Sequence, residues 1–480
     1  MLVEHVSLFL GGEWCRPANR RRIPVVSPMT EDVIGSVPEA SPRDVDAAVA
    51  AARSAFDDPQ GWSSWDPARR ADALELLASA LESRAKPMVD AVSSQNGMPV
   101  TIGRRSEAAI PATLLRYYAA MILRDPVEKE RESLAGGSTL VRREPIGVVA
   151  AIVPWNYPQS LTFFKLAPAL AAGCSVVIKP APETVLDAYL LADAVIEAGL
   201  PPGVVNIVPG RRDIGAYLVE HPGVDKVAFT GSTGAGRRIA EVCGRLLRPV
   251  TLELGGKSAA IVLDDAELTA HTAQLFGACL VNNGQTCYIS TRILAPRSRY
   301  DEVVDSVAGL ARSLVVGDPL EKSTQIGPVV SRAQRDRIED AIDGALAQGA
   351  RLVAGGKRPA GLDRGWFVEP TVFADVDNSS VLAQEEIFGP VLAVIPYEDV
   401  DDAVRIANDS PYGLGGTVWS ADAERALGVA RRVQSGSVGI NGYLIDPASP
   451  FGGVKASGLG RELGPEGLAA YQQTKSIYLR

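Results

Sequence analysis

Blocks of apolar residues alternate with amphipathic blocks along this chain, and the alternation predicts strands followed by helices. Short apolar runs bounded by Gly or Pro have the length and composition of buried strands, at 148–153, 175–178, 204–208 and 226–229. Between them, apolar residues recur at helical spacing, as in 186–198. This order is typical of a parallel, doubly wound α/β sheet with buried strands.

The flanking regions predict further elements. Residues 41–125 contain Ala- and Leu-rich stretches at helical spacing, such as 68–81, and Ser41-Pro42 is a plausible helix start. After Gly256 the alternation resumes with a strand at 259–263 and a helix at 269–279. The chain therefore predicts a second α/β domain that starts near residue 253.

Two polar segments lie outside this pattern. Residues 125–144 are rich in charge and contain Gly136-Gly137, so they are either a solvated loop or a strand excursion that pairs with a partner subunit. The carboxyl end, 472–480, alternates in part like a strand.

Composition narrows the functional class. A chain of 480 residues with 46% hydrophobic and 22% charged residues predicts a folded protein of more than one domain. A net charge of −9 argues against general binding to nucleic acid or anionic membranes. No apolar run approaches the roughly 20 residues of a membrane span, and the start carries no visible secretory signal. The scattered 5 cysteines and 3 histidines predict neither a disulfide framework nor a metal site. We therefore expect a cytoplasmic enzyme without a metal.

Cys287 is the first candidate for chemistry, because Gly284, Gln285 and Thr286 precede it instead of core hydrophobes. Glu253, in the segment TLELGGKS, supplies a carboxylate that could activate water. A thiol and such a carboxylate are enough to form a thioester and then hydrolyse it. A lone cysteine is more often an inert buried residue, so this interpretation needs further motifs.

A glycine-rich turn supplies the next motif. Residues 231–236 (GSTGAG) follow the predicted strand at 226–230 and open a predicted helix at Arg237. Small residues there let backbone N–H groups and the helix N-terminus approach a pyrophosphate. The third glycine of a strict G-x-G-x-x-G is replaced by Ile239, so the turn alone is a weak signal.

Separated segments together resemble the NAD(P)-dependent aldehyde dehydrogenase superfamily, in its hydrolytic, non-acylating branch. They occur in family order over nearly the whole chain: 154–158 (PWNYP), 229–236 (FTGSTGAG), 253–257 (ELGGK), 284–287 (GQTC), 385–390 (EEIFGP) and 451–462 (FGGVKASGLGRE). The resemblance implies oxidation of an aldehyde to the carboxylic acid, with NAD(P)+ as the hydride acceptor.

It also implies catalytic roles. Cys287 would attack the aldehyde, and the Asn156 amide with the backbone N–H of Cys287 would stabilise the oxyanion. After hydride transfer, Glu253 would activate the water that hydrolyses the thioester. Lys165 and Glu462 match family positions proposed to relay protons.

The cofactor site implied by the resemblance spans both domains. Ser232 would bind a phosphate, Lys179 lies at the end of a strand near the adenosine ribose, and Glu386 and Phe388 would contact the nicotinamide ribose and ring. The remaining matching positions are Ile152, Pro154, Trp155, Pro182, Glu183, Gly210, Phe229, Thr230, Gly231, Gly236, Leu254 and Gly255. Many NAD-preferring relatives carry a Glu at the position of Pro182. Without that carboxylate nothing there repels a 2′-phosphate, so NAD is expected and NADP stays open.

An aromatic tunnel for the aldehyde is implied by Trp155, Tyr157, Phe164, Tyr288 and Phe451. Such a tunnel favours aliphatic, aromatic or terpenoid aldehydes. The main alternative is a CoA-acylating aldehyde dehydrogenase, a branch that typically lacks the Glu253 carboxylate. A cofactor-free cysteine hydrolase would need a histidine partner that the sequence does not offer. A binding or structural protein would have no use for these catalytic residue types.

The resemblance further implies a domain division and an assembly. The dinucleotide-binding domain, of Rossmann type, would comprise 1–123 and 146–252, and the catalytic α/β domain 253–447. Residues 124–145 and 465–480 would form a small β oligomerisation arm, so a homodimer or homotetramer is expected.

Overall fold

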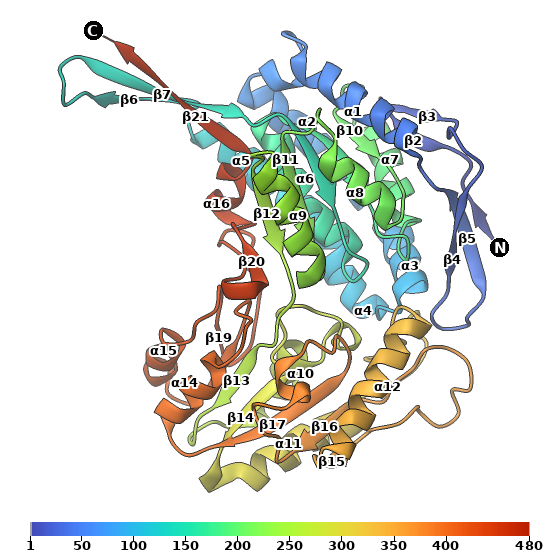
Figure 1. Ribbon diagram of the computed structural model, residues 1–480, viewed down its shortest axis with the longest axis vertical. Coiled ribbons are helices and arrows are strands. Elements are labelled where there is room, and N and C mark those ends of the chain that lie inside the picture. The colour runs from blue at the N-terminus through green and yellow to red at the C-terminus, as the bar shows by residue number, and fades with distance from the viewer. Residues whose placement is uncertain (1, 480) are drawn as a thin grey trace.

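The computed structural model describes residues 2–479 and contains two large, mostly parallel sheets, one in each half of the molecule (Figure 1). The first has eight strands in the order β20-β12-β11-β8-β9-β10-β2-β3. Their bounds are β2 Leu8–Leu10, β3 Glu13–Cys15, β8 Val148–Ile152, β9 Ser175–Lys179, β10 Val205–Ile207, β11 Lys226–Thr230, β12 Val250–Glu253 and β20 Gly458–Leu459. The strands from β12 to β10 are parallel, and β20, β2 and β3 add antiparallel edges.

Alternating side chains of this sheet enter two separate cores. Val149 and Ala151 of β8 pack into the core beneath α2, α5, α6 and α7, whereas Val148 and Ala150 face the core beneath α1, α8 and α9. Because both faces are covered, every residue of β8, β9 and β11 is buried, which explains their continuous apolar sequence. These helices are α1 Pro42–Asp57, α2 Pro67–Glu82, α5 Ala109–Arg124, α6 Pro158–Ala172, α7 Asp187–Glu197, α8 Arg212–Glu220 and α9 Thr233–Arg245.

The second sheet has seven strands in the order β15-β16-β17-β14-β13-β18-β19. Their bounds are β13 Ala259–Val262, β14 Arg292–Pro296, β15 Arg351–Ala354, β16 Thr371–Ala374, β17 Val391–Tyr397, β18 Thr417–Trp419 and β19 Gly439–Ile440. One core lies beneath α12, α13, α14 and α15, and another beneath α10 and α11. These helices are α10 Thr272–Cys279, α11 Tyr300–Ser313, α12 Arg332–Ala347, α13 Val381–Gln384, α14 Val400–Asn408 and α15 Ala423–Ala430.

Two small sheets complete the fold. Near the amino end, β1 Val3–Glu4, β4 Arg22–Val26 and β5 Val33–Pro38 pair in the order β1-β5-β4. A second sheet, β21-β7-β6, projects from the body as an arm (Figure 1). It consists of β6 Glu128–Glu132, β7 Ser138–Pro145 and β21 Gln472–Leu479, and α16 Gly464–Ala469 leads into it. Residues 125–144 are therefore a strand excursion and not a loop, and within this chain they pair with the carboxyl-terminal strand.

Most predicted elements are confirmed. The five predicted strands match β8, β9, β10, β11 and β13 to within one residue at each end, and the predicted helix at 186–198 matches α7 equally closely. The predicted helix at 269–279 is divided into a 3-10 turn, Leu268–His271, and α10.

One prediction of a helix bound was wrong. The helix after the glycine-rich turn begins at Thr233, not at Arg237, because Ser232 caps it by accepting a hydrogen bond from the Ala235 N–H at 3.4 Å. The region 41–125 is helical, as predicted, and is divided into several helices. It is interrupted between α1 and α2, and Gly97 ends α3 Ala85–Asn96 in the left-handed conformation. Between α4 Val100–Gly103 and α5, residues Arg104–Ala108 form a π-helical turn.

The predicted domain boundaries follow this division into two sheets and an arm and remain a prediction. Among residues 2–479, no helix has both the length and the apolar character needed to cross a membrane.

Candidate active site

Most residues singled out from the sequence lie where parallel strands of the first sheet end. Lys179 ends β9, Thr230 ends β11 and Glu253 ends β12, while Asn156 follows β8 by four residues. Ligands of open α/β sheets bind at this carboxyl edge. The second half of the molecule contributes Cys287, which follows the short 3-10 turn Asn282–Gly284. The fold therefore brings residues from both halves to one place.

Asn156 is buried, and its side chain is oriented by the loop that carries the thiol. Its Nδ2 donates to the carbonyl of Gln285 at 3.0 Å. A primary amide has two N–H bonds, so one remains without a partner among residues 2–479. Asn156 and Cys287 line the same cavity. The arrangement leaves an oriented N–H donor beside the thiol, as an oxyanion site requires.

The Cys287 thiol is half-buried. Burial raises the pKa of this thiol well above its usual range, and the nearby carboxylates of Glu386 and Glu253 raise it further. The resting thiol is therefore protonated at neutral pH and needs a base to form the thiolate. Gly256 packs against the same residue, since a Cβ there would lie 2.4 Å from the Cys287 carbonyl oxygen.

Glu253 carries a buried carboxyl group, and neither of its oxygens has a hydrogen-bond partner among residues 2–479. Burial raises its pKa well above the usual range, and the charge of Glu462 adds to the effect. Gly452 makes room for the side chain, because a Cβ at that position would lie 2.5 Å from Glu253 Oε1. A carboxyl group in such a setting is suited to accept a proton from water.

Lys165 and Glu462 form a buried ion pair. Lys165 Nζ donates to Glu462 Oε1 at 2.8 Å and to Thr230 Oγ1 at 2.6 Å. Lys165 is 0% exposed and Glu462 1%. Because Glu462 also acts on the pKa of Glu253, the pair lies within electrostatic reach of that group.

The glycine-rich turn and its surroundings fit the pyrophosphate of a dinucleotide. Close contacts fill the space that side chains would take: a Cβ at Gly231 would lie 2.5 Å from the Phe229 ring, and one at Gly236 would lie 2.4 Å from Leu254. A Cβ at Gly234 would meet no atom within 4 Å, so the first turn of α9 is open on that side. Exposed backbone N–H groups at a helix start attract phosphate.

The adenosine side of this site is formed by other strand ends. Lys179 Nζ donates to the carbonyls of Pro180 at 2.7 Å and Gly210 at 2.8 Å, and burial lowers its pKa to about 8. Pro182 is half-buried and Glu183 is exposed. Ile152, Pro154, Thr230 and Leu254 lie at or next to the carboxyl ends of β8, β11 and β12.

On the nicotinamide side, Glu386 Oε1 accepts a hydrogen bond from the Gly256 N–H at 3.1 Å, and burial raises the pKa of Glu386 to about 7. A Cβ at Gly255 would lie 2.4 Å from Glu386 Oε2, so the glycine is needed for this approach. The rings of Trp155 and Phe388 meet edge to face with centroids 5.3 Å apart. These contacts join the two halves around the expected ring of the cofactor.

A cavity of about 560 Å³ reaches the thiol. Of the five residues expected in an aldehyde tunnel, Tyr157, Phe164, Tyr288 and Phe451 line it. Trp155 does not line it and lies against Phe388 instead. The Tyr157 hydroxyl is 3.0 Å from Thr286 Oγ1, next to Cys287.

Sequence reasoning missed Tyr443, which completes the aromatic wall. Its ring stacks on Tyr288 with centroids 4.5 Å apart, and its hydroxyl bonds to Ser437. No local pattern marks Tyr443, because it lies in an irregular segment after β19. Its position depends on the tertiary contact with Tyr288.

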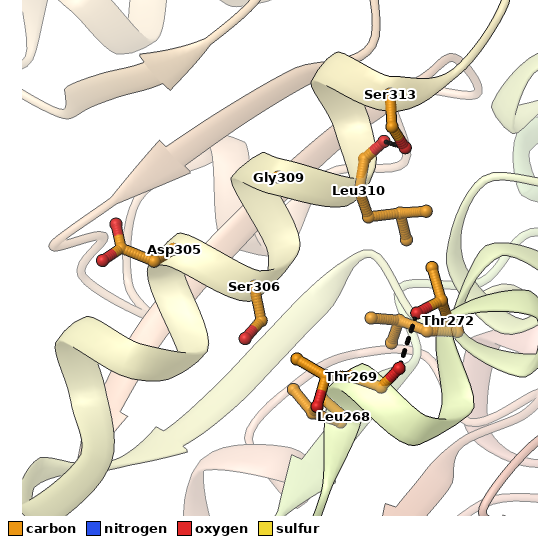
Figure 2. A pocket seen from close by; sticks show the side chains of 9 residues that line it. Leu268, Thr269, Thr272, Asp305, Ser306, Gly309, Leu310 and Ser313 are labelled. Carbon is orange, nitrogen blue, oxygen red and sulfur yellow. Dashed lines mark hydrogen bonds between the residues drawn. The ribbon is translucent and has the colours of Figure 1, made fainter.

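A separate hollow of about 280 Å³ lies between α11 and the segment Leu268–Leu275 (Figure 2). Figure 2 shows Ser306 and Leu310 on α11 pointing toward the segment with Leu268, Thr269 and Thr272, whereas the Asp305 side chain points away from it. It contains none of the residues of the thiol site, and its lining offers no nucleophilic thiol or paired carboxylates.

Comparisons with known proteins agree with this geometry. The Aldehyde dehydrogenase family matches residues 14–477 of the chain. The chain is 56% identical over 479 residues to the geranial dehydrogenase of Castellaniella defragrans, with 100% of both chains covered. It is 42% identical to the 3-succinoylsemialdehyde-pyridine dehydrogenase of a Pseudomonas species, over 99% of this chain and 98% of the relative.

Solved structures of aldehyde dehydrogenases have the same fold as this chain. The aldehyde dehydrogenase of Mycobacterium tuberculosis, complexed with NAD+, is similar with a TM-score of 0.97 and 46% identity, over 100% of this chain and 99% of that one. A variant of aldehyde dehydrogenase C from Pseudomonas syringae, complexed with NAD+ and octanal, gives a TM-score of 0.94 and 40% identity, over 98% and 96% of the two chains. The chain therefore belongs to the aldehyde dehydrogenase family of NAD(P)-dependent oxidoreductases.

Proposed function

We propose that this protein oxidises an apolar aldehyde to its carboxylic acid through a thioester on Cys287, which water activated by Glu253 then hydrolyses. One observation carries the proposal: the carboxyl group of Glu253 is buried without any hydrogen-bond partner among residues 2–479 and acts electrostatically on the Cys287 thiol. A buried carboxyl group without a partner is costly, so an enzyme that retains one has a chemical use for it.

The first step joins the thiol to the aldehyde. The sulfur of Cys287, after losing its proton, attacks the carbonyl carbon and forms a C–S bond. The negative charge that develops on the former carbonyl oxygen meets the free N–H of Asn156, whose other N–H is held by Gln285 at 3.0 Å. Protonation of this oxygen gives a thiohemiacetal, which is the tetrahedral centre from which hydride leaves.

The residues around Ser232, Lys179 and Glu386 would hold the dinucleotide, and bound NAD(P)+ supplies the acceptor for the hydride. Glu386 and Phe388 would orient the reacting end from the second half of the molecule, and the rings of Trp155 and Phe388 have centroids 5.3 Å apart. Loss of hydride from the carbon and of the proton from its oxygen leaves a thioester on Cys287. The alkyl chain stays in the aromatic cavity during this change.

Glu253 completes the reaction by accepting a proton from water as the water adds to the thioester. The C–S bond breaks, the thiol is regenerated and the carboxylic acid leaves. The raised pKa of Glu253 makes it a stronger base than an exposed glutamate. A CoA-acylating enzyme has no need of such a base, so this residue favours hydrolysis.

The expected substrates are aliphatic, aromatic or terpenoid aldehydes. Aromatic rings dominate the inner wall of the cavity, and its volume of about 560 Å³ is typical of sites for medium-sized organic ligands. The names of two relatives point the same way: one is a geranial dehydrogenase and another was solved with octanal. NAD is the expected cofactor, and Pro182 leaves room for the 2′-phosphate of NADP.

The decisive experiment replaces Glu253 by Gln, which keeps the shape and removes the base. With hexanal or geranial, the variant should release one equivalent of NADH per site and then stop, with the acyl group visible on Cys287 by intact-protein mass spectrometry. Cys287→Ala should abolish the first turnover as well. Glu241→Gln, on the exposed surface of α9, serves as the matched control. Unimpaired steady-state turnover in Glu253→Gln would exclude the proposed role.

We further propose that the protein acts in the cytoplasm as a homodimer or homotetramer assembled through the arm. The arm sheet has two edge strands, β21 and β6, whose outer sides have no partner strand among residues 2–479. Tyr478, near the end of β21, is 79% exposed. Unpaired edges next to exposed apolar residues favour association with a second chain. Analytical ultracentrifugation of the full chain and of a chain ending at Ala470 tests this, and equal masses per particle would contradict it.

A further inference from the structure

Two cationic side chains lie at the opening of the aldehyde cavity. We define the mouth as the exposed residues that line the cavity, which are Thr101, Arg105, Ala273, Lys322, Gln325 and Leu444. Arg105 belongs to the π-helical turn Arg104–Ala108 of the first half, and Lys322 to the segment between α11 and α12 of the second. The two cations therefore reach the opening from opposite halves of the molecule.

Both cations are available to a ligand. Within residues 2–479 neither forms an ion pair, whereas Arg116 on α5 is held by Glu75 at 2.8 Å and by Glu82. Because both lie at the surface, they keep their hydration until a ligand arrives, and no desolvation cost is built into the free protein. Their charges are thus not neutralised locally.

Nothing acidic offsets them inside the cavity, because its lining contains no Asp or Glu. Asp446 lies between the lining residues Ile445 and Pro447, but its carboxylate accepts hydrogen bonds from the Ala448 N–H at 2.9 Å and the Ser449 hydroxyl at 2.8 Å. Glu321 precedes Lys322 and is exposed, but it does not line the cavity. Arg105 and Lys322 are therefore the charged side chains of the cavity lining.

We propose that this mouth selects aldehydes by the charge at their far end, favouring ω-oxo carboxylates and disfavouring aldehydes with a cationic far end. The inference rests on the proposed oxidation at Cys287 and adds a second recognition element to it. The aldehyde carbon reaches the thiol, the alkyl chain lies along the aromatic wall, and a carboxylate at the other end meets Arg105 and Lys322. A quaternary ammonium group in the same place meets two like charges.

The test compares aldehydes that have the same chain and differ only in charge. kcat/KM is measured for 9-oxononanoate, nonanal and 9-(trimethylammonio)nonanal with the wild-type enzyme, Arg105→Gln, Lys322→Gln and the double variant. Each substitution should lower the ratio of kcat/KM for 9-oxononanoate to that for nonanal by about fivefold, the upper range for an exposed ion pair. The ratio of kcat/KM for 9-(trimethylammonio)nonanal to that for nonanal should rise in the same variants. In the wild-type enzyme, sodium chloride at high concentration should reduce the difference in kcat/KM between each charged aldehyde and nonanal.

Arg104→Gln is the matched control, because Arg104 is exposed on the same turn and does not line the cavity. A second readout does not depend on turnover: calorimetric binding of nonanedioate and nonanoate to Cys287→Ala, with and without the two mouth substitutions. Nonanedioate should bind more tightly than nonanoate only when both Arg105 and Lys322 are present. If the kcat/KM ratios of the charged aldehydes to nonanal were equal in the double variant and the wild type, the proposed charge selection would be overturned. Loss of oxidation with all aldehydes would overturn the proposed function instead, and the binding ratio would still decide on the mouth.

Discussion

Replacing Asn282 by Ala should both destabilise the protein and slow the first chemical step, because this residue joins the loop before Cys287 to Asn156, the proposed oxyanion donor. Asn282 is 0% exposed and adopts a left-handed backbone with φ of 54°. Its Nδ2 donates to the carbonyl of Asn156 at 3.0 Å, while Nδ2 of Asn156 donates to the carbonyl of Gln285 at 3.0 Å. Two hydrogen bonds in opposite directions thus fix Asn156 relative to the turn before Cys287.

The magnitude follows from two separate losses. Removing the hydrogen bond costs about 1 kcal/mol, near the neutral-pair average, because Asn96 still donates to the Asn156 carbonyl at 3.3 Å. Forcing Ala into the left-handed region adds about 1–2 kcal/mol. We expect Asn282→Ala to lower the free energy of unfolding by about 2–3 kcal/mol. Asn282→Gly keeps the backbone freedom, so its cost should be closer to that of the hydrogen bond alone.

The catalytic effect should be larger than the stability loss suggests. Removal of one oxyanion donor typically lowers kcat by 10²–10³-fold, and a loosened donor should lose part of that effect, about 10-fold to 100-fold. Stopped-flow measurement of the NADH burst isolates the first turnover, and chemical denaturation monitored by tryptophan fluorescence gives the stability. Both Asn282 variants should show the slower burst, since both lack the bond to Asn156.

Asn283 is the matched control. It has a φ of 59° and is 0% exposed, but its amide bonds to Gly97, Gly327 and Pro328 and not to Asn156. Asn283→Ala should therefore destabilise the protein at least as much while slowing the burst less. A burst that slows equally in both alanine variants would refute the specific role of Asn282 and leave only a general loss of structure.

Four other perturbations test different parts of the site. Because burial raises the pKa of Glu253, thioester hydrolysis should fall about tenfold per pH unit below that pKa and level off above it, and single-turnover quench assays in Glu253→Gln should show no such slope. Gly452→Ala should slow hydrolysis more than the burst, since a Cβ there would lie 2.5 Å from Glu253 Oε1; equal slowing of both would contradict this. Lys165→Met should lower the free energy of unfolding by about 3–5 kcal/mol, because Glu462 would be left buried without its partner, and denaturation curves would refute this if the midpoint stayed unchanged. Tyr443→Ala should raise KM for geranial more than for acetaldehyde, because its ring stacks on Tyr288 in the wall of the cavity, and a uniform change in KM would argue against that contact.

The five predicted strands, β8, β9, β10, β11 and β13, could be located because each is buried and contains a short apolar run with clear ends. The helices were harder to delimit. Glycines in the segment 231–236 disguised the first turn of α9, whose start is marked by the hydroxyl of Ser232. The interruptions between residues 41 and 125 depend on packing against the rest of the fold, so helical spacing alone could not locate them.

The same distinction applies to the site. Cys287, Glu253 and Asn156 lie within motifs that the sequence displays directly, and each follows or ends a strand or turn of defined type. Tyr443, Arg105 and Lys322 belong to irregular segments or a π-helical turn, and they line one cavity only in the folded chain. Their proximity is a property of the tertiary structure. Trp155 was placed in the tunnel by its motif, but its ring packs against Phe388.

The distribution of the catalytic groups between the two halves explains why the site tolerates unfavourable features. Glu253 and Asn156 belong to the first sheet, whereas Cys287 and Glu386 come from the second half, so their geometry exists only when the halves are docked. Hydrogen bonds from Asn282 and Asn156 cross that junction. The bonds that position the Asn156 amide therefore also hold the two halves together. A buried carboxyl group without a partner and two consecutive asparagines with left-handed backbones each cost stability. Such costs persist where the surrounding structure fixes them and the chemistry needs them, which under the proposed function is the activation of water beside a thioester.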